Sequence, residues 1–144
     1  MNIRDARRGT MLVALTGILF SAAADAHHSV ANFDMDKTIT IEGTVEKLEW
    51  TNPHMWLWVL TTDKNGKIDA WAMEGASPAN MQRRAGWTKR SVVPGEKVAV
   101  QLHPFRDGRL GGALDKLTKA DGTVINSGGG GAPGGPLPPA VPGK

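Results

Sequence analysis

Residues 50–58 read Trp50-Thr51-Asn52-Pro53-His54-Met55-Trp56-Leu57-Trp58, and the predicted domain is arranged around this segment. Asn52-Pro53 is typical of a turn, and residues suited to strands lie on both sides of it. The segment therefore predicts the end of one strand, a polar loop that contains His54, and the start of the next strand.

The strand before the turn is predicted over residues 38–50. Its first half places alternate residues on one face: Ile39, Ile41, Gly43 and Val45. The phase then slips, because Leu48 and Trp50 fall on even positions. A slip of this kind next to a glycine predicts a β-bulge or a sharp bend, as where one strand serves two sheets at a barrel corner.

A hairpin is predicted after the turn, with strands over residues 55–62 and 67–74 joined at Asn65-Gly66. A two-residue loop would place Leu60 opposite Trp71 and Trp58 opposite Met73. In that register one face carries three tryptophans: Trp56, Trp58 and Trp71. Both faces of the hairpin are apolar, so either both are covered or one is a binding surface.

The rest of the domain predicts a short helix and two further strands. Ser77-Pro78 is a helix start, and Gly86 is placed to end the helix after about residue 85. Residues 97–103 and 113–118 read as the fourth and fifth strands. The fold class is therefore mainly β, a small five-stranded OB-like β-barrel with one short helix between strands 3 and 4. The alternative is a β-sandwich or meander with the helix plugging one end.

The two ends of the chain differ from this domain. Residues 1–26 combine three arginines, an apolar run and the small residues Ala24-Asp25-Ala26, which is the pattern of a signal peptide. We therefore expect a bacterial periplasmic or secreted protein with no membrane span after processing. Residues 27–126 form the OB-like β-barrel domain. Residues 127–144 are almost entirely Gly, Pro and Ala and predict a disordered tail.

Composition excludes several classes of function. There is no cysteine, which excludes thiolate metal sites and thiol redox chemistry. Removal of the first 26 residues takes away three basic and two acidic side chains and lowers the formal net charge from +3 to +2. A charge this small, without a basic run, argues against nucleic acid as a partner. No catalytic motif specifies a reaction, so an enzyme is not favoured.

The four histidines suggest a metal site. In OB-folds the loops after strands 1 and 4 meet ligands, and these loops hold His54 and His103. Cleavage after Ala26 would make His27 the N-terminus, where its α-amine and imidazole can chelate one metal, with His28 beside it. Such an all-nitrogen set suits copper, with zinc as the alternative. The plainer reading makes His54 a turn residue and His103 a surface residue. The N-terminal arm must also fold back along the barrel to reach His54.

The aromatic residues suggest a second hypothesis. Trp56, Trp58 and Trp71, with Arg106 in a nearby loop, could bind a small molecule, a glycan or an exported partner protein. Tryptophans are more often core residues, because each buries a large area. Glu74, Arg106 and Asp107 are interpreted as turn and surface residues rather than catalytic ones.

Several short motifs resemble an uncharacterised family of small exported bacterial proteins. They are His27-His28-Ser29, Phe33-Asp34, Gly43-Thr44-Val45, Trp50-Thr51-Asn52-Pro53-His54, Trp71, Glu74-Gly75, Ser77-Pro78, Gly86-Trp87, Pro94-Gly95 and Arg106-Asp107-Gly108. This family is a domain of unknown function. The resemblance therefore implies an exported OB-like domain and no established activity. The Gly/Pro-rich tail is not part of the pattern.

Overall fold

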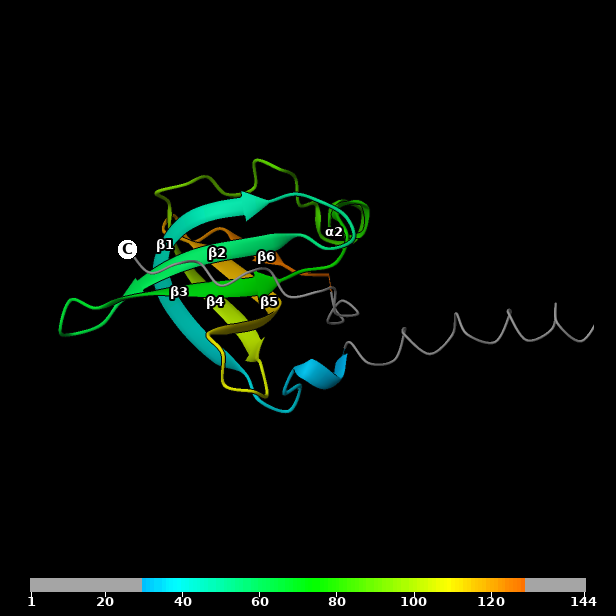
Figure 1. The fold of residues 1–144 in the computed structure, drawn as a ribbon. Coiled ribbons are helices and arrows are strands. Elements are labelled where there is room, and N and C mark those ends of the chain that lie inside the picture. The colour runs from blue at the N-terminus through cyan, green and yellow to red at the C-terminus, as the bar shows by residue number, and fades with distance from the viewer. Residues whose placement is uncertain (1–29, 129–144) are drawn as a thin grey trace, which may run out of the picture.

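The computed structural model describes residues 30–128 (Figure 1). Its elements are η1 (Val30–Asn32), β1 (Ile39–Glu49), β2 (Trp56–Thr62), β3 (Ile68–Glu74), α2 (Pro78–Ala85), β4 (Lys97–Pro104), β5 (Gly111–Lys119) and β6 (Val124–Asn126). None of the helices in this part of the chain is long and apolar enough to cross a membrane. Residues 1–29 and 129–144 lie outside the described residues, so the predicted signal peptide, the predicted disordered tail and the domain division stay predictions.

The five main strands close into a barrel. They are hydrogen-bonded in the order β3-β2-β1-β4-β5, and β3 also pairs with β5 in parallel, which joins the two ends of the sheet. The protein is thus mainly β, with a closed five-stranded OB-like barrel and one short helix between β3 and β4, as predicted. The short strand β6 extends the sheet beyond β5 and was not predicted.

The predicted phase slip in β1 is a bulge. Val45 pairs with Val59 and Lys47 pairs with Trp58, so Glu46 is an extra residue without a partner on β2. Gly43 lies against the β2 backbone, where a Cβ atom would be 2.3 Å from the carbonyl oxygen of Leu60. The bend lets β1 pair with β4 along its first half and with β2 along its second half, and Figure 1 shows the curvature.

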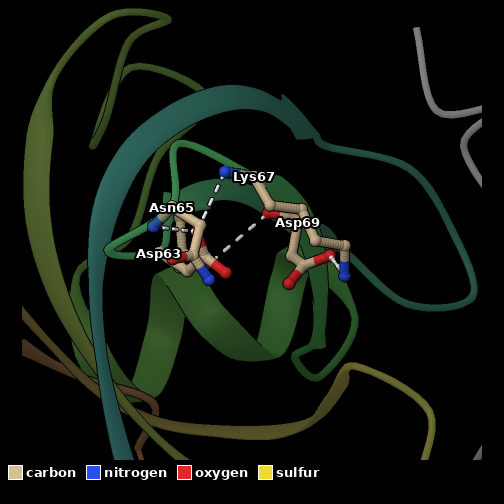
Figure 2. Close-up of polar contacts among 5 residues, drawn as sticks. Asp63, Asn65, Lys67 and Asp69 are labelled. Atoms are coloured by element: carbon tan, nitrogen blue, oxygen red, sulfur yellow. Dashed lines mark hydrogen bonds and ion pairs between the residues drawn. The ribbon is translucent and has the colours of Figure 1, made fainter.

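The hairpin register differs from the predicted one. Leu60 pairs with Ala70 and Trp58 with Ala72, one residue away from the predicted pairs. The loop is longer than two residues because Asp63 pairs with Lys67, with Gly66 in the left-handed region at φ 80°. Figure 2 shows the carboxylate of Asp63 accepting hydrogen bonds from the backbone N–H groups of Asn65 and Lys67. The prediction that Trp71 shares a face with Trp56 and Trp58 is therefore wrong.

Helix α2 begins and ends as predicted. The hydroxyl of Ser77 accepts a hydrogen bond from the backbone N–H of Asn80, and Pro78 is the first helical residue. Gly86 ends the helix in the left-handed conformation at φ 70°. Trp87 then packs inside the domain and donates its Nε1–H to the carbonyl oxygen of Asn126.

Buried side chains form two clusters on opposite faces of the sheet. The barrel core holds Val45, Met55, Leu57, Val59, Met73, Met81, Trp87, Val92, Val98, Val100, Leu102, Leu114 and Leu117. The outer cluster holds Phe33, Trp56, Trp58, Ala72, Phe105 and Ala113. Because side chains alternate along a strand, Trp56 and Trp58 of β2 face away from Leu57 and Val59 in the core. The outer cluster is a second, smaller core on the outside of the barrel wall.

Candidate functional site

The outer cluster is closed rather than open to a ligand. Trp56 and Trp58 are only 6% and 4% exposed. The ammonium of Lys47 lies 4.9 Å from the ring centroid of Trp58. Trp71 packs against the barrel core from the other face. The three tryptophans thus do not form one exposed aromatic surface, which removes the geometric basis for a stacking platform.

The segment before β1 packs on this cluster and pairs with the residues at the end of β4. Phe33 bridges to Phe105, and their ring centroids are 5.2 Å apart. Asp34 donates its backbone N–H to the carbonyl of Pro104, and Arg106 donates its backbone N–H to the carbonyl of Asn32. In Figure 1 this segment, with η1, lies beside the ends of β4 and β5. Residues 30–37, which we name the lead-in, therefore approach the wall formed by β2, β3 and β5.

His54 and Glu74 form a close pair at the edge of the outer cluster. Nδ1 of His54 lies 2.6 Å from Oε1 of Glu74, and the side chains are 12% and 1% exposed. Glu74 is the last residue of β3 and pairs with Trp56, so its side chain lies on the same face as the outer cluster. It is the one charged or polar side chain that is buried among the described residues.

The backbone around Met55 holds the two partners together. Met55 donates its N–H to the carbonyl of Ala76 and accepts a hydrogen bond from the N–H of Gly75. A Cβ atom on Gly75 would be 2.3 Å from the sulfur of the buried Met55 side chain, so a larger residue here would require that side chain to move. The loop that carries His54 is therefore fastened to the residues that follow Glu74.

One of the two groups must carry a proton, since a ring nitrogen and a carboxylate oxygen at 2.6 Å would otherwise repel each other through their lone pairs. The contact is close, but the ring N–H is not aligned as in an ordinary linear hydrogen bond. Burial lowers the pKa of His54, which favours a neutral ring at pH 7.

His103 and Arg106 bind the lead-in. Nδ1 of His103 donates to the carbonyl oxygen of Lys37, and the guanidinium of Arg106 is 3.7 Å from the carboxylate of Asp34. Glu74 and His103 both pair with Ala113, from opposite sides. Two strand spacings, about 10 Å, therefore separate their backbones.

The described residues by themselves do not complete a metal site. Nowhere in residues 30–128 do three His, Asp or Glu side chains come together as a group that could hold a metal ion. His103 thus does not join His54 and Glu74. His27 and His28 lie outside the described residues.

Residues 16–115 match the sequence profile of a family of unknown function (DUF6152). The chain belongs to the DUF6152 family. The match spans His54, Glu74 and His103, and it confirms the predicted membership of an uncharacterised family. The bacterial origin and the motifs stay predictions. No curated protein and no solved structure matches the chain. The family therefore assigns the DUF6152 domain no activity, and function has to be argued from its residues.

Glu74 is the site residue of the DUF6152 domain that sequence analysis misread as a turn or surface residue. It is the last residue of a mostly apolar strand, and the Asn65-Gly66 turn connects that strand to β2. The correct hairpin register would have placed it opposite Trp56 on the outer face. The sequence contained this information, but the predicted register was wrong by one residue and placed the Glu74 side chain on the opposite face of the hairpin.

A groove of about 420 Å³ lies elsewhere on the DUF6152 domain, over β1, β2, β4 and β5. Its lysines already have partners, since Lys97 donates to the hydroxyl of Thr44 and Lys119 pairs with Glu96. The groove contains no buried pair of titratable groups. We therefore place the candidate site at His54 and Glu74.

Proposed function

We propose that this domain is an exported metal-binding module that binds Cu(II) through His27 and His28 of the mature N-terminus together with His54. The observation that supports it is the position of Phe33, which packs in the same cluster as Trp56, two residues after His54. Five residues of extended chain span at most about 18 Å, so His28 is tethered within that distance of Phe33. The lead-in thus limits how far the N-terminal donors can lie from His54.

The donor set favours copper. A terminal amine, its own imidazole and one or two further imidazoles supply nitrogen ligands in a tetragonal arrangement, which Cu(II) prefers. Zn(II) prefers a tetrahedral set and is the weaker candidate. His103 is left out of this donor set because its Nδ1 already donates to the carbonyl oxygen of Lys37 in the lead-in. Metal binding requires deprotonated donors, so Cu(II) affinity is expected to weaken below a pH of about 6.5.

The proposal is tested by Cu(II) and Zn(II) titration of protein that begins at His27, after intact-mass measurement of the exported protein has located the cleavage site. One extra alanine before His27 is expected to lower Cu(II) affinity at least about tenfold, because it removes the terminal amine from the chelate. His54→Asn is expected to cause a similar loss, and the matched variant His103→Asn a smaller one. Equal affinity in all four proteins would refute the proposal.

A ten-residue peptide that begins at His27 is the second control, because an N-terminal His-His sequence binds Cu(II) by itself. The intact domain is expected to bind more tightly than the peptide, since His54 adds a donor at high effective concentration. If the domain binds Cu(II) no more tightly than the peptide, the N-terminal arm alone accounts for the binding.

The alternative function, a small molecule, glycan or exported protein bound through the aromatic face, has less support. It requires Trp56 and Trp58 to be accessible, and both lie under the lead-in.

A further inference from the structure

We infer that Glu74 is the positioning residue of the His54 donor: its carboxylate holds the Nδ1–H of His54 and so leaves Nε2 as the atom that meets a ligand. The consequence for metal affinity rests on the function proposed above. The orientation of the ring does not, because it can be measured in the metal-free protein.

The geometry first supports a fixed pair. Glu74 projects from the end of a barrel strand and is 1% exposed, and His54 is fastened beside it by the two backbone hydrogen bonds between Met55 and residues 75 and 76. Both side chains are thus held by regular hydrogen-bonded structure, which is the condition for a precise donor position.

The chemistry then decides which atom carries the proton. Imidazole is a stronger base than a carboxylate, with reference pKa values of about 6.5 and 4.3, so the proton between the groups belongs on Nδ1. A neutral ring with Nδ1–H has its lone pair on Nε2. Metal-binding histidines commonly use this arrangement, in which one nitrogen donates to a carboxylate and the other binds the metal.

The burial of Glu74 is consistent with a functional role. A buried carboxylate beside a histidine is seldom the most stable solution, because an apolar side chain of similar volume often stabilises a fold as well or better. Trp56, Trp58 and Ala72 show that this face accepts apolar residues. We therefore expect Glu74→Leu to fold.

The first test is the tautomer of His54 in the metal-free domain, measured from side-chain ¹⁵N chemical shifts above pH 7.5. We expect Nδ1–H in the wild type, and also in Glu74→Gln, whose amide oxygen can occupy the place of the carboxylate oxygen that faces Nδ1. Glu74→Leu is expected to shift the ring toward Nε2–H, the form that free histidine prefers in water. An Nε2–H ring in the wild type, or an unchanged ring in folded Glu74→Leu, would overturn the inference.

The second test is Cu(II) affinity. Glu74→Leu is expected to lower it by about 10- to 100-fold, the usual effect of removing a carboxylate behind a metal-bound histidine. Glu49→Gln, which removes a negative charge at the same end of β1 and β2, is expected to change it less than twofold. In a His54→Asn background, Glu74→Leu should cause no further loss, because Glu74 acts through His54.

The outcomes separate this inference from the proposed function. If His54→Asn does not change metal affinity, the proposed function fails, and the tautomer still decides the role of Glu74. If His54→Asn weakens binding and folded Glu74→Leu does not, the positioning role is refuted and the metal site stands.

Discussion

Gly111 and Gly112 lie where the first residues of β5 pass between β3 and β4. A Cβ atom on Gly111 would be 2.0 Å from the carbonyl oxygen of Ala72, and one on Gly112 would be 1.9 Å from that of His103. In each case the opposing atom belongs to a strand backbone, which cannot move aside without breaking the sheet. These two glycines therefore allow the barrel to close.

Gly112→Ala is accordingly expected to destabilise the domain by about 2 kcal/mol or more, because a steric clash adds to the cost of its positive φ. Gly95→Ala is the matched control. Gly95 also has a positive φ, at 89°, but a Cβ atom there meets nothing within 4 Å. Gly95→Ala should lower the free energy of unfolding by about 1 kcal/mol. Urea unfolding measures both, and equal losses would show that the close approach does not matter.

Residue identity alone predicted part of the candidate site. His54 stood out because it is one of four histidines in the sequence and lies in the predicted loop between the first two strands. Glu74 did not stand out, since a carboxylate at a strand end is usually solvated. Its burial depends on which face of the hairpin it occupies and on the lead-in that covers that face, and neither is a property of residue 74.

At the scale of elements, the lead-in behaves as part of the barrel wall. Phe33 is 1% exposed and contacts Phe105. Phe33→Ala is expected to cost about 3 kcal/mol, the usual loss for a buried phenylalanine. Under the proposed function it should also weaken Cu(II) binding at least about fivefold, because the arm is released while every ligand remains.

Phe33→Leu is the control for this change, because it keeps an apolar anchor and should retain most of the Cu(II) affinity. Thermal unfolding and Cu(II) titration give the two readouts. If Phe33→Ala loses stability but binds copper as tightly as the wild type, the lead-in does not deliver the arm to its site.

Three turns share an aspartate that caps backbone N–H groups. Asp63 accepts from Lys67 and Asn65, Asp107 from Arg109, and Asp121 from Thr123. These backbone hydrogen bonds lower the pKa of each carboxyl group below its ordinary value of 3.8. A lowered pKa in the folded state means that the stabilisation is present above about pH 4 and is lost as pH falls through the folded pKa values.

The melting temperature is therefore expected to fall as pH decreases from 5 to 3. A variant with all three aspartates changed to asparagine should begin lower at pH 7 and fall less steeply. Parallel melting curves for the triple variant and the wild type would contradict this origin of the acid sensitivity.

The hairpin shows why element boundaries were easier to predict than register. Asn65-Gly66 marks the turn correctly, but it fits both a two-residue loop and the observed loop closed by Asp63 and Lys67. The choice depends on the Asp63 side chain and on packing against the rest of the barrel. A difference of one residue then decides whether Trp71 points inward or outward.

At the scale of the whole molecule, the order of elements was enough to predict the OB-like barrel. The bulge in β1, the Ser77-Pro78 start and the Gly86 stop of α2 were all visible because local backbone geometry demands those residue types. The outer cluster was not visible, since it depends on a tertiary contact between Phe33 and Phe105. Strand β6 was missed because three residues carry too short an alternation to recognise.

The closure of the barrel has a consequence for how the chain folds. β1 pairs with β2, which is nearby in sequence. Its other edge stays unpaired until β4 has been made, because Ile39 pairs with Leu102. The free edge of β3 stays unpaired for longer, until β5 has been made. A chain that emerges from its N-terminus therefore exposes two unpaired strand edges until nearly the whole domain has been made, and such edges promote aggregation. Fragments that stop before β5 are expected to self-associate rather than to form part of a barrel.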